Sequence, residues 1–204
     1  KPAYSILPKG FPGYNPDVVG LNYDPELAKK LMSESQYADS ASRPRITISV
    51  PGTGGTIGLD LEVIIEMWKQ VLGVEVEIQQ VEWATYLDEL DKQSFQAYAG
   101  LGWSADYPDP QDFLDILFHS ESSMNHGAYV NKEVDALLEK ARIEADVINR
   151  MSLYNQAEQI ILNDAVWLPL WFTGDSYILV KPHIKGFEMT PMIIPKLHLI
   201  DFDN

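Results

Sequence analysis

The chain of 204 residues contains no cysteine, and it carries half as many basic residues as acidic ones, 15 against 30. Without cysteine there is no disulfide framework, no thiolate metal site and no thiol nucleophile. The formal net charge of −15 opposes binding to nucleic acid or to an anionic membrane surface. No apolar run approaches the roughly 18 residues of a membrane span, and the given sequence does not open with a signal-peptide pattern. We expect the chain to come from the middle of a longer protein.

Sequence motifs of enzymes and cofactor sites are missing as well. There is no G-x-S-x-G and no H-E-x-x-H, and the four histidines at 119, 126, 183 and 198 are scattered, which favours loop or surface positions. The glycine-rich segment 52–55 satisfies neither phosphate-loop pattern. Two of the 30 acids could still meet in space as a catalytic pair, but none stands out. The sequence therefore predicts a protein that is not an enzyme and has no cofactor and no metal site.

Hydrophobic periodicity in the first half predicts an α/β fold. A helix over 24–36, capped by Asp24, comes first. Three strands then alternate with two helices, which implies a parallel sheet with right-handed crossovers. The expected strands are Arg45–Val50, Val74–Val81 and Phe95–Trp103, and the expected helices are 61–72, ended by Gly73, and 85–93.

The second half has a different pattern. Two helices are predicted over 134–145 and 147–163. An apolar strand is predicted over 166–173, with Pro169 placing it at an edge or a bulge, and it could form a hairpin with 176–180. The last residues again resemble a strand.

Residues 100–118 carry the most information about a site. A predicted strand ends at Trp103, Asp106 follows, and a helix starts at Asp109-Pro110, a cap followed by proline. Asp109 can serve as the helix cap, so Asp106 is left as a free carboxylate beside the aromatic ring of Trp103. Both residues follow the carboxyl end of a predicted strand. Open α/β proteins bind ligands at such strand ends. A packed tryptophan beside a solvated turn aspartate is the simpler interpretation from chemistry alone.

Two further patterns surround this segment. Asp106, Asp109, Asp112 and Asp115 recur every three residues and suggest calcium, but they lack the glycine and glutamate of an EF-hand. Trp83 follows the second predicted strand, so two neighbouring strands ending in tryptophans would set two flat walls beside Asp106.

Several segments together resemble one protein family. W-S-A-D-Y-P-D-P at 103–110, followed by F-L-x-x-L-F, is similar to the signature of the peptide/nickel class (family 5) of extracytoplasmic solute-binding proteins, which serve ABC importers. Further similar stretches in the same order are G-Y-N-P at 13–16, Y-D-P-E-L-A-K-K-L-M at 23–32, the runs at 128–142 and 150–162, and A-V-W-L-P-L-W at 165–171. The resemblance covers most of the chain.

The resemblance implies a ligand site and a partner. In the family, the V-E-W and W-x-A-D segments face the ligand, and the aspartate pairs with the free amino group of a peptide. Carried over, this implies ligand contacts at Trp83, Trp103 and Asp106, with backbone contacts from Gly102 and Ser104. The implied function is binding of an oligopeptide or dipeptide for the membrane permease of an ABC importer. Sugars or metal complexes, or a catalytic or sensor domain on the same fold, remain alternatives.

Length separates this chain from full members of the family, which are two-lobed and two to three times larger. We therefore expect a carboxyl-terminal lobe of the periplasmic-binding-protein type, monomeric and extracytoplasmic, whose amino-terminal lobe is missing by truncation. Residues 1–42 would end the hinge-proximal region of the missing lobe and form a linker. Residues 43–165 would form the ligand-binding lobe, and 166–204 the strands that return toward the missing lobe.

Overall fold

The computed structural model of the protein describes residues 2–52, 54–55, 57–172, 178–188 and 196–203. The chain divides into two compact units, which are described separately below. The sheet unit comprises Asn22–Leu101 and His126–Ala128. The helical unit comprises Lys1–Leu21, Gly102–Asn125 and Tyr129–Asn204. These boundaries differ from those of the three predicted segments, so the assignment of segments to lobes stays a prediction.

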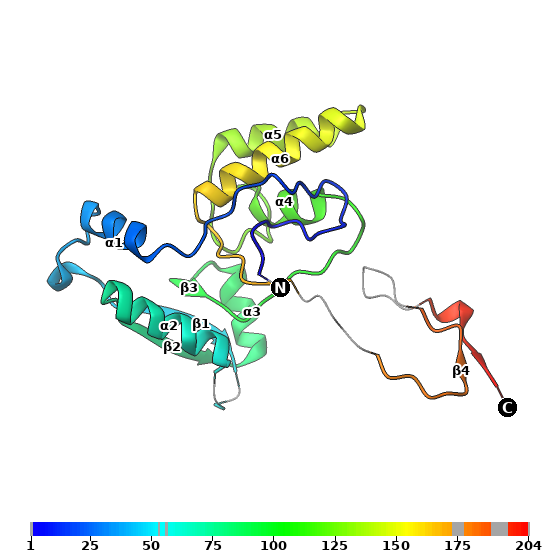
Figure 1. The fold of residues 1–204 in the computed structure, drawn as a ribbon, viewed down its shortest axis with the longest axis horizontal. Coiled ribbons are helices and arrows are strands. Elements are labelled where there is room, and N and C mark those ends of the chain that lie inside the picture. Colours follow the sequence, from blue (N-terminus) through cyan, green and yellow to red (C-terminus); the bar gives the residue numbers. More distant parts are fainter. Residues whose placement is uncertain (1, 53, 56, 173–177, 189–195, 204) are drawn as a thin grey trace. The chain divides into compact units, whose positions relative to one another are not determined.

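The sheet unit contains the predicted parallel sheet (Figure 1). Strand β1 (Ile46–Pro51) lies in the middle and pairs in parallel with β2 (Val76–Val81) on one side and with β3 (Ala97–Tyr98) on the other. The mixed α/β fold and the three parallel strands are therefore confirmed. The predicted strand Phe95–Trp103 is wrong in extent, because only two of its residues pair with β1. Gly100 follows with a φ of +86°, which turns the chain out of the extended conformation.

Helices join these strands at the predicted places, and local chemistry explains their ends. Helix α1 (Pro25–Glu34) begins where the Asp24 carboxylate accepts the N–H of Leu27. Helix α2 (Leu59–Leu72) ends at Gly73, whose φ of +65° suits a left-handed C-cap. Helix α3 (Trp83–Asp91) begins at Glu82, whose carboxylate accepts the N–H groups of Ala84 and Thr85. A short 3₁₀ turn, η1 (Ser40–Ser42), precedes β1.

The helical unit is built around α4 (Gln111–Phe118), α5 (Lys132–Ile143) and α6 (Val147–Asn163), with α5 and α6 side by side (Figure 1). The predicted helices 134–145 and 147–163 are confirmed, the first with a shift of two residues. These three helices and the N-terminal segment bury an apolar core. Its fully buried members include Leu7, Leu114, Phe118, Val134, Leu138, Ala141, Tyr154 and Ala157.

A buried carboxylate ties the N-terminal segment to this core. Glu158 on α6 is 0% exposed, and its Oε1 accepts the backbone N–H groups of Ile6 at 2.7 Å and Leu7 at 2.9 Å. Its Oε2 has no hydrogen-bond partner among the residues described above, and burial raises the pKa of the Glu158 carboxyl. The two backbone bonds oppose that rise.

The end of the chain is less regular than predicted. Residues 166–172 form no strand beyond a single antiparallel bridge between Pro2 and Trp171, because Pro169 lacks a donor for a ladder. The predicted hairpin with 176–180 lies largely outside the described residues. A small antiparallel ladder joins β4 (Ile184–Lys185) to β5 (Asp201–Phe202), and η2 (Leu197–Leu199) precedes β5.

Candidate ligand-binding site

The loop that leads into α4 holds four of the five predicted site residues. Gly102, Ser104 and Asp106 are exposed, whereas Trp103 is partly buried and packs against the core of the helical unit. The strand that was expected to end at Trp103 ends at Tyr98, so the tryptophan belongs to a loop. This loop therefore needs contacts other than a strand ladder to hold its shape.

Asp112, in the first turn of α4, supplies those contacts. Its Oδ2 accepts the indole N–H of Trp103 and the backbone N–H of Asp106, both at 3.1 Å. Burial raises the pKa of the Asp112 carboxyl, and the charges of Asp106 and Asp109 add to the rise, while the two hydrogen bonds oppose it. One buried oxygen thus joins the aromatic ring to the backbone of the exposed carboxylate.

The next aspartate in the series has a structural role. The structure begins α4 at Gln111 with Pro110 as its N-cap, so the predicted cap at Asp109 is displaced by one residue, but Asp109 still accepts the N–H of Gln111 at 3.0 Å. Its two oxygens also accept two hydrogen bonds of 2.7 Å each from the guanidinium of Arg150 on α6, and this pairing raises the pKa of Arg150. Asp109 is therefore neutralised, and Asp106 is not used in the cap.

Asp115 is paired in the same way. Arg142 on α5 donates to its two oxygens from Nε and Nη2, each at 2.6 Å, and this pairing raises the pKa of Arg142. Each of the four aspartates thus has its own environment, and they do not converge on one point. Across the described part of the chain, no group of three or more His, Cys, Asp or Glu residues is placed to hold a metal ion.

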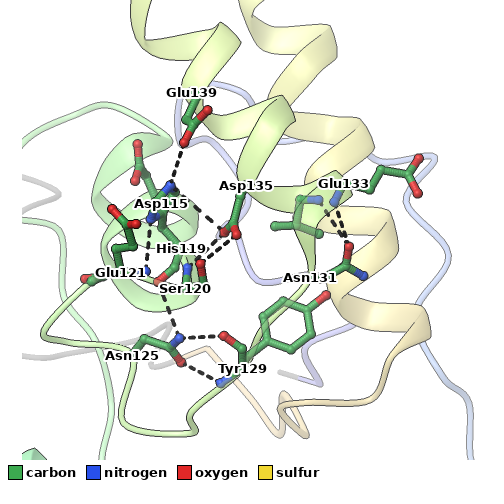
Figure 2. A network of polar contacts seen from close by, with 12 residues as sticks. Asp115, His119, Ser120, Glu121, Asn125, Tyr129, Asn131, Glu133, Asp135 and Glu139 are labelled. Atoms are coloured by element: carbon green, nitrogen blue, oxygen red, sulfur yellow. Dashed lines mark hydrogen bonds and ion pairs between the residues drawn. The ribbon is translucent and has the colours of Figure 1, made fainter.

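A polar network fixes the connection between α4 and α5 (Figure 2). Ser120 donates from its N–H and its hydroxyl to Asp135 at 2.9 and 2.6 Å. The N–H of Glu121 donates to Nδ1 of His119 at 3.2 Å, which places the ring proton on Nε2, 3.4 Å from Glu139. His119 is 4% exposed and follows the last residue of α4, so of the predicted loop or surface positions it occupies the loop. These hydrogen bonds therefore stabilise the loop between α4 and α5.

Trp83 lies in the other compact unit. It is the first residue of α3, is 52% exposed and stacks on the ring of Tyr86 with centroids 6.3 Å apart. The expectation that Trp83 and Trp103 end neighbouring strands is wrong: β1 separates β2 from β3, and β3 ends before Trp103. Whether Trp83 joins the others around a ligand stays a prediction.

Comparison with known proteins identifies the family. A profile for the bacterial extracellular solute-binding proteins, family 5 Middle, matches residues 1–125. The periplasmic oligopeptide-binding protein OppA of Escherichia coli (strain K12) is 31% identical over 192 residues, 91% of this chain and 34% of OppA. Heme-binding protein A of Haemophilus influenzae (strain ATCC 51907 / DSM 11121 / KW20 / Rd) is 31% identical over 196 residues, 93% of this chain and 35% of that protein.

Solved structures agree. The Escherichia coli murein tripeptide binding protein MppA matches 99% of this chain and 40% of its own, with a TM-score of 0.80 and 26% identity. The chain therefore belongs to the family 5 bacterial extracellular solute-binding proteins. It spans about a third of the length of the curated relatives it matches, 34% of one and 35% of the other. Among the described residues, no helix is both long and apolar enough to cross a membrane.

Proposed function

We propose that this chain supplies part of the ligand site of an extracytoplasmic solute-binding protein, which delivers an oligopeptide or dipeptide to the membrane permease of an ABC importer. The proposal rests on the loop 102–106, which Asp112 holds in place by two hydrogen bonds. It presents an exposed carboxylate and a partly exposed tryptophan, held by the same buried oxygen. The relatives named for oligopeptides and a murein tripeptide support a peptide as the solute.

Each site residue has a distinct role in this proposal. The carboxylate of Asp106 accepts hydrogen bonds from the ammonium group of the peptide and balances its charge. Trp103 and Trp83 provide flat apolar surfaces, and the exposed backbone at Gly102 and Ser104 offers hydrogen bonds to the peptide backbone. This is recognition without bond making, so the chain needs no catalytic residue and no cofactor.

The rest of the binding protein would complete the site. The missing amino-terminal lobe would close over the ligand and exclude water, as hinged two-lobed binding proteins do. A monomer is sufficient for this mechanism. The permease would then meet the closed form outside the cytoplasm.

A second solute class has its own support. Heme-binding protein A is as similar to this chain as the peptide-binding relatives are, at 31% identity. The same architecture could therefore hold a metal complex, for which the carboxylate of Asp106 would be one hydrogen-bond acceptor among several.

Calorimetry on the full-length protein that contains this chain tests the proposal. Asp106→Asn should weaken a peptide with a free amino terminus by about ten- to a hundredfold, since a hydrogen bond to a charged group contributes roughly 1.5–3 kcal/mol. The N-acetylated peptide should bind both forms alike. Asp17→Asn, an equal charge change at an exposed aspartate of the same unit, is the matched control.

Two results would contradict the proposal. One is an Asp106→Asn protein that discriminates between the free and acetylated peptides as well as the unaltered protein does. The other is tight binding by the 204-residue chain alone, because a single lobe can enclose only part of the ligand.

A further inference from the structure

The four aspartates around the start of α4 differ in how their charges are balanced. Asp109 and Asp115 each form a two-pronged ion pair with an arginine. Among the described residues, no cation pairs with Asp106 or Asp112. The local excess of negative charge therefore resides on one exposed carboxylate and on one buried carboxylate directly behind its loop.

The position of Asp112 is costly for folding alone. The residue is 0% exposed, and its Oδ1 has no hydrogen-bond partner in the part of the chain that the structure describes. A buried carboxylate without a cation is unfavourable, and an unsatisfied buried acceptor adds to the cost. Asp112 makes no capping bond to α4; its hydrogen bonds go to Trp103 and Asp106 instead. Buried groups of this kind occur in structural roles, as at Glu158, and at functional sites, so the partners of Asp112 decide between the two.

The hydrogen bonds of Asp112 indicate what it serves. Its Oδ2 holds the ring nitrogen of Trp103 and the backbone nitrogen of Asp106. Between these two residues the chain forms no strand or helix that could fix their spacing. The Trp103 ring and the Asp106 carboxylate must keep a fixed separation to bind the same ammonium-bearing ligand. Errors of about 1 Å in that separation are enough to weaken such a site.

The geometry points to Asp112 as the positioning residue of the ligand site, which holds the Trp103 ring and the Asp106 backbone in the arrangement that selects a cationic amine. This inference rests on the function proposed above and deepens it. Asp112 acts in two ways: its oxygen fixes the loop, and its unbalanced charge lies behind the Asp106 carboxylate and favours a positive ligand over a neutral one.

Two substitutions separate these actions. Asp112→Asn keeps an oxygen that can accept both N–H groups and removes the charge. Asp112→Ala removes both. Glu158 provides the matched control, because it is also 0% exposed, also accepts two backbone N–H groups on one oxygen, and also leaves the other oxygen unpartnered. Its partners are Ile6 and Leu7, outside the 102–106 loop.

Two measurements on the full-length protein read the outcome. The first is ¹⁹F NMR of fluorotryptophan-labelled protein, with the signal of Trp103 assigned through Trp103→Phe. The second is calorimetric affinity for a peptide with a free amino terminus and for its acetylated form. Asp112→Ala should broaden or shift the Trp103 signal and weaken the free peptide by about tenfold or more.

The other variants should behave differently. Asp112→Asn should leave the Trp103 signal in place and lose mainly the preference for the free peptide over the acetylated one. Glu158→Ala should lower stability while leaving the Trp103 signal and the affinity within roughly threefold. An unchanged Trp103 signal in Asp112→Ala, or an equal loss of affinity in Glu158→Ala, would overturn the inference.

Failure of the proposed function looks different from failure of this inference. If the unaltered protein binds neither peptide, the proposed peptide function is wrong. The Trp103 signal still decides in that case whether Asp112 positions the loop, since it is recorded without ligand.

Discussion

Replacing Arg142 by methionine would leave Asp115 as a buried carboxylate without its donors. The arginine gives Asp115 two hydrogen bonds of 2.6 Å, and the side chains are 41% and 5% exposed, respectively. Methionine keeps an unbranched apolar side chain and removes the donors and the positive charge. The perturbation therefore tests the ion pair rather than the packing.

The expected loss follows from the two exposures. Breaking a buried pair by removing one partner costs about 3–5 kcal/mol. The Arg142 side chain is 41% exposed, so water reaches the site and screens the remaining charge. We therefore expect Arg142→Met to lower the free energy of unfolding by about 2–3 kcal/mol.

Urea denaturation followed by circular dichroism measures this loss by linear extrapolation. Asp115→Asn in the Arg142→Met background should recover about 1 kcal/mol or more, because it removes the stranded charge. The control is Lys92→Met, which breaks an ion pair to Asp88 whose two side chains are 58% and 60% exposed, and should cost at most about 1 kcal/mol. If Arg142→Met costs no more than Lys92→Met, or if the double variant is no more stable than Arg142→Met, the reasoning fails.

Two further predictions concern titrating groups. Burial raises the pKa of Glu158, so between its usual value of 4.5 and the raised pKa the folded chain binds more protons than the unfolded chain. The free energy of unfolding should therefore fall as pH rises through that window, and Glu158→Gln should flatten the slope in urea denaturation at a series of pH values; an unchanged slope would contradict this. Burial, with a smaller effect of Tyr98, raises the pKa of Tyr86 to about 12. In an ultraviolet titration, Tyr86→Phe should remove absorbance that develops around pH 12 and leave the earlier tyrosines unchanged; loss of an earlier component would refute the burial argument.

Local features of the fold could be predicted from the sequence. Asp24 and Gly73 mark helix ends because a cap depends on neighbours within three or four residues. The parallel sheet also follows from local patterns, since helices of sufficient length join consecutive strands. The extent of β3 could not be predicted, because it depends on which residues lie opposite β1 in the folded chain.

The candidate site shows the same division between local and distant information. The resemblance of the W-S-A-D segment was sufficient to name Trp103 and Asp106. The role of Asp112 was missed, because one carboxylate among four at a spacing of three cannot be assigned from spacing alone. Its neighbours in the series are neutralised by arginines 27 and 41 residues away. Only tertiary structure distinguishes the paired aspartates from the unpaired ones.

The bond between Glu158 and the N-terminal segment has a consequence for synthesis. Its partners are 151 and 152 residues apart in sequence, and the whole sheet unit is inserted between them. At a translation rate of about 5–20 residues per second, the first residues wait roughly 8–30 s before α6 exists. The continuous segment 22–101 can fold during that interval. The helical unit cannot form the bonds of Ile6 and Leu7 until Glu158 has been translated, so it completes its fold after segment 22–101 can, although its first residues are made earlier.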